Sequence, residues 1–288
     1  MKLILSDSNN PYYNLAVEEW AVRNIDTSDC DYLFLYVNKD CVVVGRNQNV
    51  FQEVNIDYCK KNNIDICRRV SGGGTVFHDL QNINWTFISK FDLKKVNNYN
   101  IFSESIIAVL KQIGLNAVLN ERNAIMVGNT KVSGQAQFTN RKNILSHGTL
   151  LVGSNVERLN DSTIITNYKV ETKAIKSVRS DVKTINDLTE KTNSIKSLKE
   201  FIVNENEITE TFDILETVID SDIKAIETTY RTKKWIYERS SSCIIEKEFK
   251  GMILKLKIEK SFVTKVSNKK GEEIKLHPFL NCNILDFI

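Results

Sequence analysis

Residues 68–79, RRVSGGGTVFHD, hold the densest glycine cluster of the chain, and the interpretation of the whole sequence starts from them. The consecutive glycines Gly72, Gly73 and Gly74 follow an apolar run that is typical of a strand. Glycines here let the backbone approach a ligand and direct its N–H groups at an anion. The Gly-Lys-Ser/Thr of a P-loop is missing, as are the helix and later acid of a dinucleotide-binding turn. The turn alone is as consistent with a tight loop as with an anion site.

Basic and titratable side chains flank this turn. Arg68 and Arg69 precede the glycines, and a guanidinium fork is suited to phosphate oxygens, although surface salt bridges are the alternative. His78 follows the glycines and is expected either to line a pocket or to act as a structural hydrogen-bonding group. These neighbours favour a binding site for an anion.

A second cluster contains Lys131 in the string KVSG, residues 131–134, and is followed by SHGTL at residues 146–150. A lysine on a short strand beside a Ser-Gly turn could direct its ammonium group into a pocket and attract a carboxylate and a phosphate. At about 4 Å and an effective dielectric constant near 20, such an attraction is worth about 4 kcal/mol before desolvation is subtracted. The alternative is an exposed lysine, one of 39 basic residues.

The composition limits the class of protein. The chain has 288 residues and a net charge of only +3, so it lacks the uniform field that would hold a nucleic-acid backbone, and we expect no nucleic-acid partner. A four-residue apolar start is too short for a secretory signal, and no stretch reaches the ~20 apolar residues of a membrane span. The six cysteines have irregular spacing, which indicates reduced thiols rather than a metal site. We expect a cytoplasmic protein without membrane contact.

The pattern of secondary structure predicts an α+β fold, with a mixed or antiparallel sheet flanked by helices, because strands and helices follow one another without regular βαβ alternation. The runs 32–37 and 41–45, joined by Asn38-Lys39-Asp40, predict a hairpin. Further strands are expected over residues 3–5, 64–69, 84–89, 117–119, 124–127, 130–133 and 149–152. Helices are expected over residues 14–24, 54–62, 99–113 and, within a helical region 194–239, over 212–226.

The last part of the chain has a different pattern. Residues 243–245, 251–258 and 261–266 alternate apolar and charged residues, as a small solvent-facing sheet would. We therefore predict a large domain of residues 1–239 and a small domain of residues 240–288. With only two prolines in the chain, a long disordered linker between them is not expected.

Six strings in this order resemble the lipoate-protein ligase A family: NLAVEEW (14–20), VVVGRNQN (42–49), RRVSGGGTVFHDLQNINWTF (68–87), KVSGQAQ (131–137), SHGTLL (146–151) and AIKSVRS (174–180). The resemblance implies the catalytic fold of the biotin and lipoate ligases in residues 1–239, with a shortened accessory domain in 240–288. It also implies an enzyme that activates lipoic acid with ATP and Mg²⁺ as lipoyl-AMP. The lipoyl group would then pass to a lysine of the lipoyl domain of a 2-oxoacid dehydrogenase E2 subunit, or of the glycine cleavage H protein.

The resemblance also assigns roles to individual residues. Lys131 corresponds to the catalytic lysine, placed against the lipoate carboxylate and the α-phosphate. The other expected nucleotide contacts are Arg69, Gly74, Thr75, Val76, Phe77, Asn123 and Arg179. The expected lipoate contacts are Tyr36, Arg69, Ser71, Gly72, Gly73, Gly74, His78, Lys131, Gly134 and His147. No protein side chain is assigned to a metal.

Two departures from the family pattern concern adenylation. The family commonly has an acid near the nucleotide and metal where this chain has Ala124, and often a basic residue where it has Phe138, although Arg141 could substitute. Two alternatives therefore remain: an ATP-independent lipoyl or octanoyl transferase of the same fold, and a non-catalytic lipoate-binding protein. A thioester-forming transferase needs a nucleophilic cysteine, and Cys41 and Cys67 lie nearest the motifs.

Overall fold

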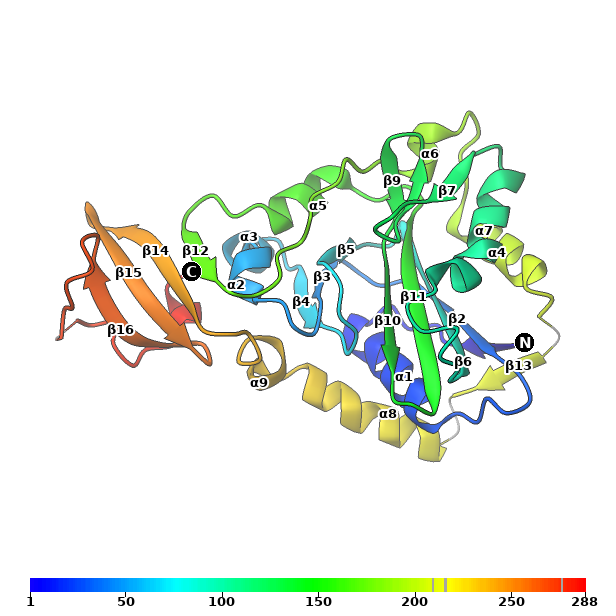
Figure 1. Ribbon diagram of the computed structural model, residues 1–288, viewed down its shortest axis with the longest axis horizontal. Helices are drawn as coiled ribbons and strands as arrows, with labels where there is room; N and C mark the ends of the chain where they lie inside the picture. The colour runs from blue at the N-terminus through cyan, green and yellow to red at the C-terminus, as the bar shows by residue number, and fades with distance from the viewer. Residues whose placement is uncertain (209, 215–216, 276) are drawn as a thin grey trace.

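A computed structural model describes residues 1–208, 210–214, 217–275 and 277–288 (Figure 1). Its largest sheet is mixed: β1 runs parallel to β2 and β13, and the remaining pairs are antiparallel. The strand order is β10 (Gln135–Thr139), β11 (Asn143–Leu151), β6 (Asn82–Lys90), β2 (Tyr32–Tyr36), β1 (Lys2–Leu5) and β13 (Glu210–Asp213). This mixed sheet with helices on its faces confirms the predicted α+β class.

Helices cover both faces of this sheet because the sheet strands are apolar on both sides. In β2, Phe34 packs with α1 (Pro11–Asn24) and α8 (Thr217–Tyr230), whereas Leu33 and Leu35 pack with α4 (Tyr99–Gln112) and α7 (Ile195–Glu205). Alternate side chains of a strand point to opposite faces, which explains this division. Helix α1 begins where the Asn10 side chain accepts a hydrogen bond from the backbone N–H of Tyr12.

A three-stranded sheet carries the glycine turn. It contains β3 (Cys41–Val44), β4 (Asp65–Arg68) and β5 (Val76–His78), and α2 (Val50–Glu53) and α3 (Ile56–Lys61) connect β3 to β4. The predicted hairpin is wrong, because β2 belongs to the six-stranded sheet and β3 pairs with β4 and β5. In the connection between β2 and β3, the buried Asn38 side chain bonds to Asn14 and His78.

A small antiparallel sheet lies next to the long strand β11. It contains β7 (Ala117–Leu119), β8 (Ile125–Val127) and β9 (Thr130–Ser133), as the sequence predicts. The strand expected over 149–152 is the end of β11, and the sequence analysis missed β10. α5 (Val156–Thr163) and α6 (Ile185–Leu188) follow β11 along the chain.

The C-terminal strands β14 (Cys243–Phe249), β15 (Met252–Glu259) and β16 (Phe262–Asn268) form an antiparallel sheet at one end of the molecule (Figure 1). This sheet also recruits β12 (Lys169–Thr172) from the earlier part of the chain, and its apolar face shares one core with β3 and β4. α9 (Lys233–Ile236) precedes it and the short 3₁₀ helix Ile284–Asp286 ends it. The domain boundary near residue 240 remains a prediction.

The helical region expected over 194–239 contains α7, α8 and α9, with β13 between the first two. Phe212, expected to begin a helix, lies in β13, and residues 215–216 of that expected helix lie outside the described residues. Within the described part of the chain, no helix has both the length and the apolar character needed to cross a bilayer.

Candidate active site

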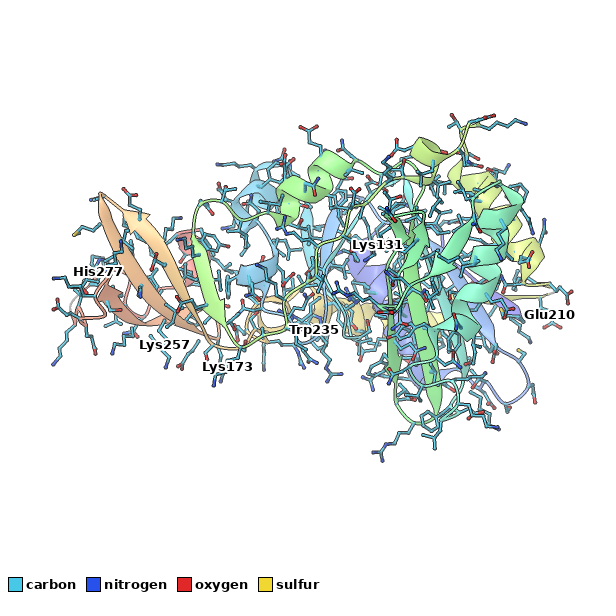
Figure 2. The ribbon with its side chains drawn as sticks, turned by 45° about the horizontal axis from the view of Figure 1, so that its top comes forward. Lys131, Lys173, Glu210, Trp235, Lys257 and His277 are labelled. Carbon is cyan, nitrogen blue, oxygen red and sulfur yellow. The ribbon has the colours of Figure 1, made fainter. Side chains whose placement is uncertain are left out.

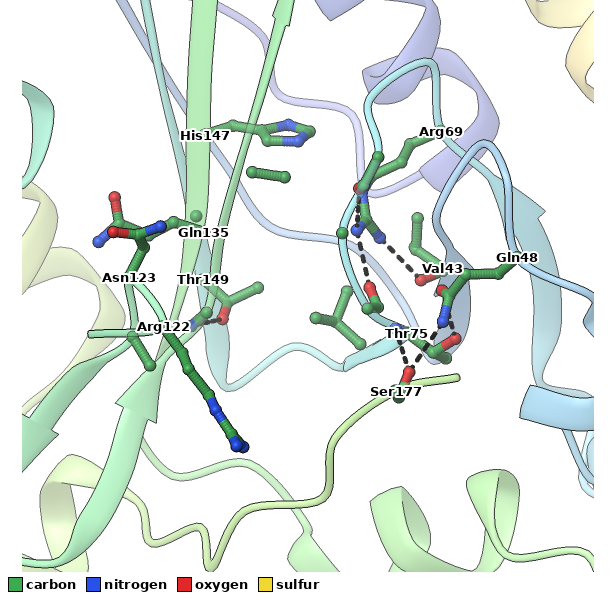
Figure 3. A pocket seen from close by; sticks show the side chains of 18 of the residues that line it. Val43, Gln48, Arg69, Thr75, Arg122, Asn123, Gln135, His147, Thr149 and Ser177 are labelled. Carbon is green, nitrogen blue, oxygen red and sulfur yellow. Dashed lines mark hydrogen bonds between the residues drawn. The ribbon is translucent and has the colours of Figure 1, made fainter. Parts of the chain in front are cut away.

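A pocket of about 450 Å³ opens between the glycine turn that joins β4 to β5 and the strands β9, β10 and β11 (Figure 3). Most of the residues predicted from the sequence meet in its lining: Tyr36, Arg69, Gly72, Gly73, Gly74, Thr75, Val76, His78, Asn123, Lys131, Gly134 and His147. Segments more than a hundred residues apart in sequence therefore form one site.

Three predicted site residues lie outside this lining. Ser71 is buried behind the glycine turn, where it contacts His147. Phe77 points away from Val76 and His78, as strand alternation requires, and it lines a second pocket of about 190 Å³. Arg179 also lines this second pocket, and one of its N–H groups donates to the carbonyl of Thr163 at 3.2 Å. The two pockets adjoin, because Lys131, Thr75 and Thr149 line both.

Arg69 braces the glycine turn from inside. Its guanidinium donates to the carbonyls of Gly72 and Gly74 at 2.6 and 2.7 Å, to the Val43 carbonyl at 3.1 Å, and to Ser71 Oγ at 2.9 Å. Burial lowers the pKa of Arg69 to about 10, so it remains a cation at neutral pH. Arg69 thus fixes the turn conformation and brings positive charge to the edge of the pocket.

The glycines allow this close packing. Gly73 has a φ of +82°, and a Cβ atom built there would lie 3.0 Å from Arg69 Nη2. A Cβ on Gly45, in the loop after β3, would lie 2.2 Å from the Gly73 carbonyl oxygen. Both positions therefore need glycine for a steric reason.

Arg68 is neither a phosphate ligand in the pocket nor part of a surface salt bridge, so both interpretations of this residue are wrong. Its side chain is fully buried and donates to the carbonyls of Gly45, Gln48 and Ile236 and to Ser240 Oγ. All five of its N–H groups face protein acceptors, since Nη1 also bonds to the Arg46 carbonyl. Arg68 therefore ties the segment after α9 to the loop that supports the glycine turn.

A buried network of hydrogen-bonded side chains reaches Arg69 through its Nε atom. Glu18, in α1, accepts hydrogen bonds from Tyr36 at 3.1 Å, from His147 Nδ1 at 2.9 Å, and from Thr86. His147 Nε2 lies 2.7 Å from Ser71 Oγ, which in turn accepts from Arg69 Nε. Although burial opposes ionisation of Glu18, its neighbour His147 and the hydrogen bonds from Thr86 and Tyr36 lower its pKa overall. An unbroken chain of hydrogen bonds thus connects a carboxylate to the brace of the glycine turn.

Lys131 lies on β9 and directs its amine into the site rather than into open solvent. A Cβ atom on Gly134 would lie 3.0 Å from Lys131 Nζ, so the amine rests against that glycine, across the pocket from the glycine turn. Burial and the nearby Arg69 lower the pKa of Lys131. Lys131 forms no ion pair or side-chain hydrogen bond with the described residues, and its charge is available to a ligand.

The charges around the main pocket have one sign. Among the described residues its lining includes Arg69, Arg122, Lys131 and Lys176 and no aspartate or glutamate. An anionic ligand is therefore favoured. The described residues also contain no group of three or more His, Cys, Asp or Glu side chains that could hold a metal ion. This donor set does not fit a resident Mg²⁺ site, because Mg²⁺ prefers carboxylate oxygens.

Ala124 lies in the pocket lining at the end of a tight turn. The Asn120 side chain accepts hydrogen bonds from the backbone N–H groups of Arg122 and Ala124, at 3.0 and 2.9 Å. Asn123 has a φ of +59°, a conformation that asparagine tolerates well. The turn directs Arg122 into the pocket (Figure 3). A cationic side chain therefore occupies this edge instead of an acid.

Residues 173–181, called the cover segment below, cross the mouth of the pocket. Ser177 is its anchor: Ser177 Oγ accepts from the Thr75 backbone N–H and from Gln48 Nε2, both at 2.9 Å (Figure 3), and its N–H donates to Glu53. Ile175 and Val178 line the pocket mouth, yet are 77% and 62% exposed. The cover segment therefore places apolar surface at the entrance, and Ser177 links it to the glycine turn.

The sequence analysis missed Glu18, Asn84 and Arg122. Glu18 follows Leu15 by three residues, so both lie on one face of α1, and a carboxylate on an apolar helix face was the available signal. Asn84 lies in the strand β6 with both neighbours apolar. Arg122 precedes Asn123, which was predicted, and no pattern distinguishes it from other basic residues.

The fold and the pocket define an α+β domain with a pocket whose basic lining favours an anionic ligand. Comparison with known sequences is more specific: the chain belongs to the lipoyl protein ligase A/B catalytic domain family, which it matches over residues 10–207. The resemblance stated from the six strings is thereby confirmed.

Individual relatives agree with this family. The chain is 42% identical over 172 residues to lipoate-protein ligase LplJ of Bacillus subtilis, a match that covers 60% of this chain and 52% of the relative. It is 39% identical over 180 residues to lipoate–protein ligase 1 of Staphylococcus aureus, covering 62% of this chain and 55% of the relative. The chain thus aligns with about half the length of these relatives.

Solved structures have the same fold over more of the chain. A protein of T. acidophilum with bound lipoic acid has a TM-score of 0.70 and 25% identity, covering 82% of this chain and 97% of the other. A lipoate-protein ligase A bound with ATP has the same TM-score and identity, covering 81% of this chain and 97% of the other.

Proposed function

We propose that this protein activates lipoate with ATP to form lipoyl-AMP and transfers the lipoyl group to a lysine of a lipoyl carrier domain. The observation that supports this proposal most strongly is the meeting of Lys131 with the glycine turn in one pocket, whose described lining residues include basic but no acidic side chains. A carboxylate and a phosphate brought together there would otherwise repel each other. The relatives named lipoate-protein ligase and the neighbours solved with lipoic acid or ATP point to the same ligands.

In the first step, a lipoate carboxylate oxygen attacks the α-phosphorus of ATP, and the bond to pyrophosphate breaks. The Lys131 ammonium and the backbone N–H groups of Gly72–Gly74 neutralise charge that develops on the carboxylate and the phosphate. The acyl tail extends into the main pocket toward Tyr36, and the nucleotide uses the adjoining pocket near Phe77. Mg²⁺ enters as part of the substrate Mg–ATP.

In the second step, the carrier lysine amine attacks the acyl carbon of lipoyl-AMP and AMP leaves with the electron pair of the broken bond. The cover segment excludes water from this mixed anhydride, with Arg179 near the second pocket. The carrier class, the lipoyl domain of a 2-oxoacid dehydrogenase E2 subunit or the glycine cleavage H protein, is proposed from the family resemblance.

The transferase alternative that runs through a thioester lacks support from the site. Among the described residues, no cysteine lines either pocket. Cys41 and Cys67 are fully buried, and burial raises the pKa of the Cys41 thiol well above its ordinary value. A nucleophilic cysteine needs the opposite environment, accessible and with a lowered pKa.

The proposal is tested by lipoate-dependent exchange of labelled pyrophosphate into ATP. The wild type should exchange, and Lys131→Ala should lose at least a hundredfold in exchange rate, because the charge at the reacting centre is removed. Lys257→Ala is the control, since Lys257 is exposed on β15 of the C-terminal sheet and lines neither pocket (Figure 2). Full exchange by Lys131→Ala would refute the assignment of Lys131. Absence of exchange in the wild type, together with lipoyl transfer from a carrier without ATP, would favour the transferase.

A further inference from the structure

The closed end of the main pocket has an aliphatic wall and a few polar side chains. Leu15 and Val43 contribute its aliphatic wall, and the hydroxyl of Tyr36 is already bonded to Glu18. Arg69 and His147 also bond to other protein groups, and two further polar lining residues, His78 and Asn84, are 3% and 2% exposed. Lys131 and the cover segment lie at the opposite, open end, so the far end of an acyl chain bound by its carboxylate would reach His78 and Asn84.

The hydrogen bonds around His78 define which of its nitrogens carries the proton. Asn14 Nδ2 donates to the Ser8 carbonyl and to Asn38 Oδ1, so the Asn38 amide presents its Nδ2 to His78 Nδ1 at 3.0 Å. His78 Nδ1 must then accept, and the proton of the neutral ring lies on Nε2. Burial lowers the pKa of His78 to about 3, which keeps the ring neutral.

The His78 Nε2 atom is buried without a hydrogen-bond partner among the described residues. Asn84 has the same property: Asn82 Nδ2 donates to Asn84 Oδ1 at 3.0 Å, and Asn84 Nδ2 is buried and unpartnered. Two buried donors on residues that line one pocket are thus left without an acceptor among the described residues. Buried polar groups are normally paired, so this arrangement points to acceptor atoms in a ligand.

We infer that His78 Nε2–H and Asn84 Nδ2–H determine specificity by donating to the dithiolane sulfur atoms at the far end of lipoate. This inference rests on the proposed function and adds a ligand preference to it. Disulfide sulfur is a weak acceptor, but it is the only acceptor at that end of the molecule. The methyl end of octanoate has none, so octanoate would leave both donors buried and unpaired. The pocket therefore prefers lipoate to a plain fatty acid.

Equilibrium binding measured by calorimetry without ATP tests the inference separately from catalysis. Three carboxylates are compared: lipoate, octanoate and 5-cyclopentylpentanoate, which keeps the five-membered ring and replaces both sulfur atoms by carbon. The wild type should bind lipoate about tenfold more tightly than the cyclopentyl analogue, since an unpaired buried donor is costly. Equal affinities for these two ligands would overturn the inference.

The variants separate the donors from the shape of the pocket. His78→Asn places an amide oxygen near the Nδ1 position, where it can still accept from Asn38, but it lacks the Nε2 donor. Asn84→Leu removes the second donor at similar volume. Each variant should reduce the preference for lipoate over the cyclopentyl analogue at least threefold. His277→Asn is the control, because His277 lies on the distant C-terminal region (Figure 2), and it should leave the preference unchanged.

The outcomes distinguish this inference from the proposed function. If His78→Asn and Asn84→Leu lower the affinity for all three ligands equally, or for none of them, the two donors do not recognise the sulfur atoms. The inference then fails while the ligase proposal stands. If the wild type binds none of the three carboxylates, the proposed function fails and this inference fails with it. Loss of the preference in both variants, with octanoate binding retained, supports the inference.

Discussion

The buried network of Glu18, His147, Ser71 and Arg69 and the cover segment lie on opposite sides of the pocket, and they are built from different contacts. Every member of the network is almost fully buried and is bonded to the next member. The cover segment instead exposes Ile175 and Val178 and is fixed to the glycine turn through Ser177. The difference indicates a preformed binding wall opposite a segment that can move for entry and release.

Among the substitutions that test this difference, we expect the largest effect on stability at Glu18. Glu18→Gln removes the carboxylate that faces His147 and compensates the buried Arg69 cation, so it should lower the free energy of unfolding by about 3 kcal/mol. Lipoate affinity should fall as well, because the network supports the brace of the glycine turn. Urea unfolding and calorimetry measure both effects.

Glu104→Gln is the matched control for this prediction. Glu104 is exposed on α4, and its replacement should change stability by less than about 0.5 kcal/mol. If Glu18→Gln is as stable as the control, the network is not a preformed wall and the contrast with the cover segment disappears.

The second prediction uses pH to probe the buried side of the pocket. The pKa of His78 is lowered to about 3, against about 6.5 for an exposed histidine. Between these values the unfolded chain binds a proton that the folded chain does not, so stability decreases as the pH falls through this window. At about 1.4 kcal/mol per pH unit, roughly 2 kcal/mol should be lost between pH 6.5 and pH 5.

Urea unfolding at pH 7, 6 and 5 measures this loss in the wild type and in His78→Asn, which has no imidazole to protonate. The variant should show a smaller dependence on pH than the wild type. An unchanged dependence in His78→Asn would contradict the assignment of a buried neutral ring.

The sequence predicted the composition of the site better than the pairing of the strands. Motif strings place Lys131 and the glycines because each string is local, and the strand β9 that carries the lysine was also expected. The error at the 38–40 turn arose because β2 and β3 are both buried apolar strands, so only their tertiary partners decide whether they pair. Local patterns do not contain that information.

The two neighbouring arginines show the same limit at the level of side chains. Arg68 and Arg69 are adjacent residues of the same type, and the sequence does not distinguish them. In the structure, Arg68 extends toward α9 and Arg69 braces the glycine turn. Adjacent residues at the end of a strand point in opposite directions, and only the packing of the C-terminal segment shows which direction leads to the pocket. Glu18 was missed for a related reason, since its partners His147 and Thr86 come from strands far along the chain.

The third prediction concerns the glycine turn, which lies between the network and the cover segment. Gly73→Ala should destabilise the protein by about 1–2 kcal/mol, because the residue has a positive φ and its Cβ would press on Arg69. Gly72→Ala is the control, since a Cβ there meets nothing within 4 Å. Thermal unfolding of the two variants should therefore differ, and equal melting temperatures would show that the turn is not held rigidly by Arg69.

The smallest effect on stability is expected in the cover segment. Ser177→Ala removes the acceptor of the Thr75 N–H and of Gln48, and should cost about 0.5–1 kcal/mol, since both donors lie near solvent. Its effect on local order should be larger than its effect on unfolding, because no other side chain of the segment bonds to the glycine turn among the described residues.

Limited trypsin digestion measures this local order directly: cleavage after Lys176 and Arg179 should become several times faster in Ser177→Ala. Ser180→Ala, which alters an exposed serine of the same segment, should digest at the wild-type rate. Equal digestion of both variants would mean that the segment is held by contacts other than Ser177, and that the two sides of the pocket differ less in rigidity than their hydrogen bonds indicate.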